Sequence, residues 1–141
     1  AEQSILGALP YADNEVVLHT DTRLLPQRKL AWASWNYRLG GPGHTRAAVT
    51  YDMNILQGIQ SDITFCVSLN QSAGISPFKV LAKYTYAHPQ YSLAAVAAQG
   101  RWEELNGIEH TWYCGAYWAN GFHEDGVVSA LRVAHAFGEQ L

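Results

Sequence analysis

The residues best suited to ligand chemistry lie in the segment 111–138, which reads TWYCGAYWANGFHEDGVVSALRVAHAFG. The pattern predicts a short apolar strand over residues 112–114, then Gly115, a loop that carries Gly121, and a long helix that begins near Glu124. Glycines at a strand-to-helix turn let a ligand approach the backbone closely. The free N–H groups at the start of a helix form an electropositive mouth. The segment therefore indicates a site for an anionic or electron-rich group.

The same segment holds side chains that bind metals or exchange protons in other proteins. His123, Glu124 and Asp125 are adjacent, so they point in different directions on a helix, and HExxH spacing is absent. We expect no metal site, and the two acidic residues are typical of a first helical turn. A catalytic pair of Cys114 with His110 or His123 is an alternative, but a cysteine in an apolar strand favours a buried, inert thiol.

Aromatic side chains mark two other predicted strands. Residues 31–38 (AWASWNYR) alternate, with Trp35 and Tyr37 on one face and Trp32 on the other, and a period of two predicts a strand. We expect these aromatics in the core, with a substrate wall as the alternative. Tyr84 and Tyr86 lie near the end of another predicted strand and are candidates for an aromatic beside the ligand.

The remaining elements follow from periodicity, proline and glycine. Residues 2–9 are predicted to be a short helix, Ser92 to cap a helix that Gly100 ends, and residues 127–137 to be helical with an apolar stripe. The stripe consists of Val127, Ala130, Leu131, Ala134 and Phe137. Predicted strands cover residues 14–21, 31–38, 46–52, 63–69 and 79–86. The fold class is α+β: an antiparallel sheet of about four strands, then a helix and a closing strand–loop–helix unit.

Composition limits the classes of function. The 141 residues are 48% hydrophobic and 15% charged, which is typical of a globular domain. The net charge of −3, without a basic run, argues against nucleic acid as a partner. Two cysteines outside any CxxC pair argue against zinc or a disulfide framework and favour a cytoplasmic location. We find no apolar run long enough to cross a bilayer.

The pattern aromatic–aromatic–Cys–Gly, a loop, then GFHEDGV and an alanine-rich helix resembles the closing segment of the flavin amine oxidases and their desaturase-like relatives. The phrases HTDTRLLP, AWASWNY, YDMN and YAHPQY are similar to those of a bacterial subgroup of predicted NAD/FAD-binding proteins. The resemblance implies an FAD-dependent oxidoreductase. Residues 1–110 would be a substrate-domain-like sheet with helices. Residues 111–141 would supply the closing strand and helix of the FAD-binding domain.

The resemblance also implies roles for individual residues. His123 would donate its backbone N–H to the flavin ring. Substrate would be lined by Tyr84, Tyr86 and Phe122. Contacts to FAD would come from Gly115, Ala116, Phe122, His123, Glu124, Gly126 and Val127.

These 141 residues contain no GxGxxG, the motif that binds the ADP part of FAD. We therefore expect a piece of a protein roughly three times this length. The missing N-terminal FAD-binding region would be its partner, and the piece alone would be inactive and bind FAD weakly. The intact enzyme would remove hydride from an apolar amine or a lipid-like substrate. The alternative is a non-catalytic binding or interaction module without flavin.

Overall fold

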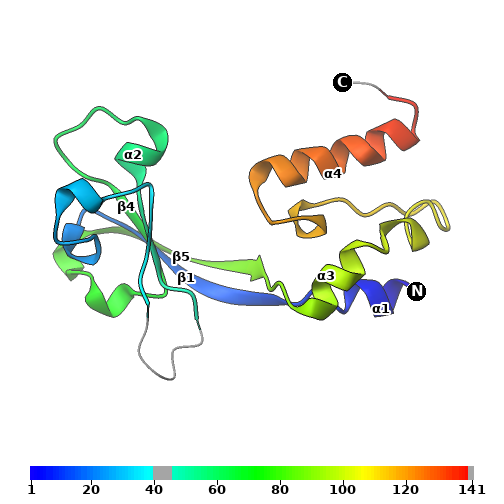
Figure 1. The fold of residues 1–141 in the computed structure, drawn as a ribbon, viewed down its shortest axis with the longest axis horizontal. Helices are drawn as coiled ribbons and strands as arrows, with labels where there is room; N and C mark the ends of the chain where they lie inside the picture. Colours follow the sequence, from blue (N-terminus) through cyan, green and yellow to red (C-terminus); the bar gives the residue numbers. More distant parts are fainter. Residues whose placement is uncertain (40–45, 140–141) are drawn as a thin grey trace. The chain divides into compact units, whose positions relative to one another are not determined.

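The computed structural model describes residues 1–39 and 46–139 (Figure 1). Their contacts divide the chain into two compact units, Asp13–Ala87 and the pair of segments Ala1–Ala12 and His88–Leu141. The chain passes from one unit to the other inside strands β1 (Tyr11–His19) and β5 (Val80–Pro89). The expected boundary at residues 110/111 does not coincide with this division, and the assignment of either part to an FAD-binding domain stays a prediction.

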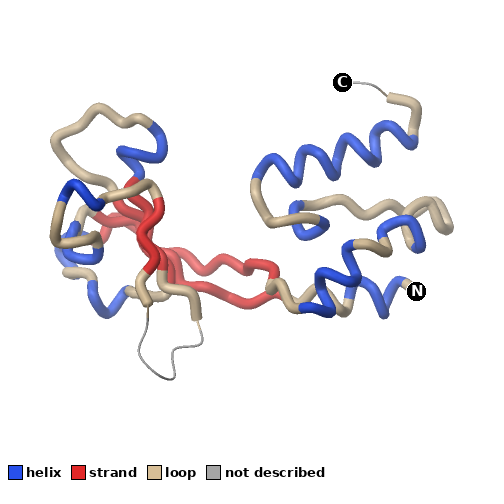
Figure 2. The backbone as a smooth tube through the Cα atoms, in the orientation of Figure 1, coloured by secondary structure: helices blue, strands red, loops and turns tan. Residues whose placement is uncertain are grey.

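The sheet has five antiparallel strands in the order β2-β3-β4-β1-β5, drawn in red in Figure 2. Strands β1 and β5 are joined in this sheet by β2 (Trp35–Tyr37), β3 (Val49–Asp52) and β4 (Cys66–Leu69). The α+β class and the antiparallel sheet are confirmed, with five strands instead of about four. Strands β2 and β3 pair antiparallel, with Trp35 opposite Tyr51. The sequence also predicts a hairpin loop at the glycine-rich residues 40–43, which lie outside the described residues.

The two faces of the sheet have an unexpected polarity. Directly opposite residues in antiparallel strands share a face, and the register places Val17, Ser68 and Thr50 in one row and His19, Cys66 and Asp52 in the next. All six are buried. The other face carries the aromatic side chains, and Trp35 and Tyr37 are 52% and 61% exposed. The prediction that these two aromatics belong to the core is therefore wrong.

Hydrogen bonding explains how a polar face can be buried. The Asp21 N–H donates to His19 Nδ1 at 3.1 Å, so the ring proton is assigned to Nε2, which donates to Ser68 Oγ at 2.8 Å. The Ser68 hydroxyl is then free to donate to Thr50 Oγ1 at 2.7 Å. Burial lowers the pKa of His19, against the opposing charge of Asp21, and keeps the ring neutral. Burial also raises the pKa of the Cys66 thiol to about 12.

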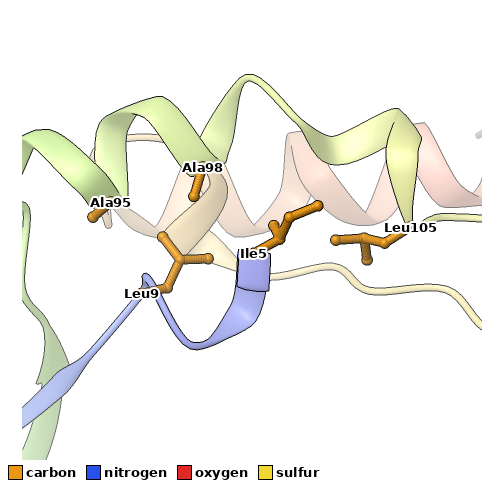
Figure 3. Close-up of a cluster of buried hydrophobic side chains, with 5 residues drawn as sticks. All are labelled: Ile5, Leu9, Ala95, Ala98 and Leu105. Carbon is orange, nitrogen blue, oxygen red and sulfur yellow. The ribbon is translucent and has the colours of Figure 1, made fainter. Parts of the chain in front are cut away.

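The unit formed by Ala1–Ala12 and His88–Leu141 is built from helices α1 (Glu2–Leu6), α3 (Leu93–Gln99) and α4 (His123–Ala136). Helix α1 packs on α3, and the core of this unit is apolar (Figure 3). That core consists of Ile5, Leu9, Ala95, Ala98 and Leu105. The Ser92 hydroxyl accepts the Ala95 N–H at 3.0 Å, which confirms the predicted cap of α3. The one remaining α-helix of the described residues, α2 (Met53–Gln57), is capped by Asp52 in the other unit.

Helix length bears on any membrane-spanning role. The longest helix among the described residues is α4, with 14 residues. A bilayer crossing takes about 20 apolar residues. Within the described part of the chain, no helix therefore has the length and apolarity to span a membrane.

Candidate functional site

Helix α4 begins at His123, next to the position that the sequence predicted (Figure 1). The Asp125 carboxylate accepts the backbone N–H groups of Asn120 and Phe122 at 3.0 and 2.9 Å, which fixes the chain as it enters the helix. The Gly126 N–H makes the first bond of the helix, to the Phe122 carbonyl at 3.3 Å. The N–H groups of residues 123–125 precede that bond, so they are the donors that α4 presents at its start.

The predicted strand at residues 112–114 is wrong, because the structure has no strand there. Side chains satisfy this backbone instead of a neighbouring strand. The Tyr113 N–H donates to Asn106 Oδ1 at 2.5 Å, and Trp102 Nε1 donates to the Tyr113 carbonyl at 3.2 Å. Cys114 is exposed, so the prediction of a buried thiol at that position is also wrong, and Cys66 is the buried cysteine.

Gly115 precedes the single turn η6 (Ala116–Trp118) and has a backbone conformation that only glycine adopts readily, with φ +152° and ψ +161°. A Cβ atom at this position would lie 2.4 Å from Cε1 of Tyr117. The Gly115 N–H donates to Oγ of Ser129, a buried residue of α4, at 3.1 Å. Contacts within the chain therefore account for this glycine.

Gln99 holds η6 from the other side. Its Nε2 group donates to the carbonyls of Tyr117 and Ala119 at 2.9 and 2.6 Å. No local sequence pattern indicates the positioning roles of Gln99, Asn106 and Ser129. Their hydrogen-bond partners lie 7 to 20 residues away in the sequence, and only the folded chain brings them within bonding distance.

Gly126, in the first turns of α4, faces Ala116. A Cβ atom at Gly126 would lie 3.8 Å from the Ala116 nitrogen and 3.9 Å from the Ala116 Cβ, which are ordinary contact distances. The structure therefore brings two of the expected cofactor-binding residues together. Packing does not require a glycine at position 126, although glycine costs about 1 kcal/mol relative to alanine inside a helix.

The predicted apolar stripe of α4 is only partly packed. Val127 and Phe137 are 51% and 66% exposed, and the buried side chain of the helix is Ser129. The bond between Gly115 and Ser129 turns that side of the helix toward η6. Within the stripe, Leu131 and Ala134 are half-buried, and the Phe137 ring lies 5.5 Å from the ring of Trp112. The expected flavin-facing residues Phe122, His123 and Glu124 are also exposed.

A shallow depression of about 110 Å³ lies beside α4. Its walls include the indole of Trp102, over which the Arg132 guanidinium carbon lies 3.8 Å from the ring centroid. Arg132 also pairs with Glu103 at 3.1 Å. Pockets for drug-sized ligands measure about 300–1,000 Å³. The depression is too small to enclose a flavin ring.

Tyr84 and Tyr86, the other expected substrate-lining residues, lie on β5 in the unit Asp13–Ala87. Their rings stack on each other with centroids 5.6 Å apart and an interplanar angle of 10°. The two side chains are 47% and 51% exposed. They form a flat aromatic plate on one face of the strand, as residues two apart in a strand do.

Comparison of the chain with protein-family models and with curated proteins gave no match.

Proposed function

We propose that this chain is the C-terminal portion of an FAD-dependent oxidoreductase that removes hydride from an apolar amine or a lipid-like substrate. The start of α4 is the feature that supports the proposal. Three backbone donors gather there, next to a glycine that packing does not require. A flavin edge lying against Gly126 and Ala116 would explain why this helix keeps a glycine.

The fit of these residues to FAD is partial. The N–H groups of residues 123–125 suit the pyrimidine oxygen of a flavin, which gathers negative charge on reduction. The Asp125 carboxylate opposes that charge, but its Oδ2 already accepts the N–H groups of Asn120 and Phe122. The small depression beside α4 encloses no ring. The residues can therefore hold one edge of the cofactor at most, and the proposal requires an N-terminal FAD-binding region to enclose the rest.

In the proposed reaction, FAD supplies a hydride acceptor, and the protein places the substrate and excludes water. The donors of α4 would stabilise charge that develops at the flavin edge. Phe122 is 51% exposed and offers an apolar ring beside those donors. An apolar chain packs on phenylalanine as well as an amine does, so a lipid-like substrate fits as well. No side chain of α4 is assigned as an acid or a base.

The decisive variant removes one backbone donor and leaves the helix intact. His123 is the first helical residue, where proline is well tolerated because its N–H makes no intrahelical bond. Phe122, with φ −79° and ψ +161°, already has the conformation that precedes proline. His123→Pro in the full gene product should weaken FAD binding and make the flavin midpoint potential more negative. His123→Ala, which keeps the N–H, should do neither.

Equal FAD affinity and equal potential in the proline and alanine variants would refute the role of α4 in the proposal. The chain of 141 residues by itself should bind FAD weakly, which a flavin fluorescence titration measures. A dissociation constant in the nanomolar or low micromolar range would contradict that expectation. The alternative, a binding module without flavin, would be favoured if the gene encodes no GxGxxG before Ala1.

A further inference from the structure

Asparagine is followed by glycine at two places in the sequence, Asn106–Gly107 and Asn120–Gly121. In such a pair the backbone nitrogen of the glycine can attack the side-chain amide carbon of the asparagine, because glycine has no side chain to block the approach. The reacting groups belong to neighbouring residues, so the attack is intramolecular and needs no enzyme. Both pairs can therefore undergo spontaneous deamidation, and the fold decides which of them reacts.

Deamidation of an asparagine takes place in two steps. The glycine nitrogen loses its proton and forms a bond to the asparagine Cγ, and the Cγ–Nδ2 bond breaks to release ammonia. Water then opens the resulting succinimide ring at one of its two carbonyls. Opening at one carbonyl gives aspartate, and opening at the other gives isoaspartate, in which the main chain continues through Cγ. Water is the only co-reactant, and nothing is oxidised or reduced.

The fold protects Asn106 from this reaction. Its side chain is buried, donates from Nδ2 to the Trp102 carbonyl at 2.9 Å and accepts the Tyr113 N–H at Oδ1 at 2.5 Å. The Gly107 nitrogen donates to the Thr111 carbonyl at 2.9 Å. These three hydrogen bonds hold both reacting groups, so they must open before the nitrogen can reach Cγ.

Asn120 lacks this protection. The residue is exposed, and its side chain makes none of the hydrogen bonds found in the described part of the chain. The backbone N–H of Asn120 donates to Asp125, which leaves the side-chain amide free to turn. The Gly121 nitrogen donates to the Ala116 carbonyl at 3.2 Å. One hydrogen bond of the reacting groups must therefore open here, against three at Asn106.

We propose that Asn120 is a site of spontaneous deamidation in the folded protein, and that its isoaspartate product loosens the start of α4. The backbone N–H groups of Asn120 and Phe122 both donate to the Asp125 carboxylate. Isoaspartate adds one main-chain carbon between these two donors, so the two bonds cannot both keep their geometry. The inference goes beyond the flavin proposal, because it requires no flavin.

Mass spectrometry measures both asparagines in one sample of the chain, incubated at mildly alkaline pH and physiological temperature. One tryptic peptide, residues 102–132, contains both sites, and its fragment ions show which asparagine has gained the mass of deamidation. In the folded protein Asn120 should react at least about tenfold faster than Asn106, because two fewer hydrogen bonds must open. In concentrated urea the two rates should agree within about threefold, because the protecting bonds are lost.

Asn120→Gln is the matched variant, because glutamine keeps the backbone N–H and an exposed amide, but its extra methylene disfavours ring closure. After the same incubation, hydrogen exchange of the amides of residues 126–129 should be about fivefold faster in the isoaspartate form of the parent chain than in the variant. If the variant does not fold by circular dichroism, the fresh parent chain is the reference.

Three results would overturn the inference. Asn106 could react as fast as Asn120 in the folded protein. Asn120 could stay intact in the folded protein over a period in which both asparagines react in urea. Amide exchange at the start of α4 could be the same in the isoaspartate form and in the reference.

Discussion

The buried polar face of the sheet makes the stability of the unit Asp13–Ala87 depend on pH. His19 is fully buried, accepts a hydrogen bond at Nδ1 and donates one from Nε2. Burial lowers its pKa below the ordinary value of 6.5. As the pH falls, His19 therefore takes up a proton in the unfolded chain before it does so in the folded chain. The stabilisation is complete above the unfolded pKa and is lost as the pH falls below it.

The magnitude follows from the linkage relation. Where His19 stays neutral in the folded state, protonation of the unfolded chain alone determines the slope. The free energy of unfolding should then fall by at most about 1.4 kcal/mol between about pH 7.5 and about pH 5.5. Urea unfolding, followed by the amide signals of β3 and β4, measures this value for the correct unit. Asp21 lies close to His19, but its own titration takes place at a lower pH.

A matched variant tests the assignment to His19. His19→Gln retains an amide donor near the position of Nε2 but does not titrate. The variant should be less stable at neutral pH, and its free energy of unfolding should be nearly constant across the same pH range. Ser68→Ala leaves the Nε2 donor buried without its acceptor, which should cost about 1–3 kcal/mol. If His19→Gln keeps the pH dependence of the parent sequence, the reasoning is refuted.

Three further outcomes follow from the backbone and from one carboxylate. Gly115→Ala should destabilise the chain by at least about 1 kcal/mol, because the ring of Tyr117 leaves no room for a side chain there. Gly126→Ala should stabilise the chain by up to about 1 kcal/mol, because alanine is the better helix former. Thermal unfolding of the two variants and the parent protein measures both effects. Glu109 and His110 both have positive φ, so the double change Glu109→Asn and His110→Gly should raise the melting temperature, with an unchanged value as the contrary result. Hydrogen bonds from Arg23 hold the pKa of Asp21 well below its usual range, so stability should fall as the pH drops below about 4, and Asp21→Asn should remove that loss in acid unfolding curves.

Local pattern predicted the sheet because strand formation here follows alternation and β-branched residues. It did not predict which face is buried. Alternation separates Trp35 from Asn36 but leaves the choice of the inner face to the surroundings. The chain buries the polar face because His19, Ser68 and Thr50 satisfy one another. Those partners lie 18 to 49 residues apart, so no local pattern reveals them.

In the segment before α4, the local pattern predicted a strand that the structure does not have. Residues 112–114 have the composition of a strand, but a strand needs a neighbour to accept its hydrogen bonds. In the described residues the side chains of Asn106 and Trp102 take that role. The start of α4 was predicted to within one residue, because its glycine and acidic residues are local signals. Its packed side was not, because the hydrogen bond from Gly115 to Ser129 decides it.

The glycines of the candidate site separate into two kinds once packing is known. Gly115 is explained by the chain itself, since its backbone conformation and the ring of Tyr117 exclude any side chain. Gly126 has no such explanation, since a methyl group would make ordinary contacts with Ala116. A helix that retains a destabilising glycine without a packing reason favours a ligand close to its backbone. The flavin proposal therefore depends on Gly126 and the donors of residues 123–125, and much less on the turn at Gly115.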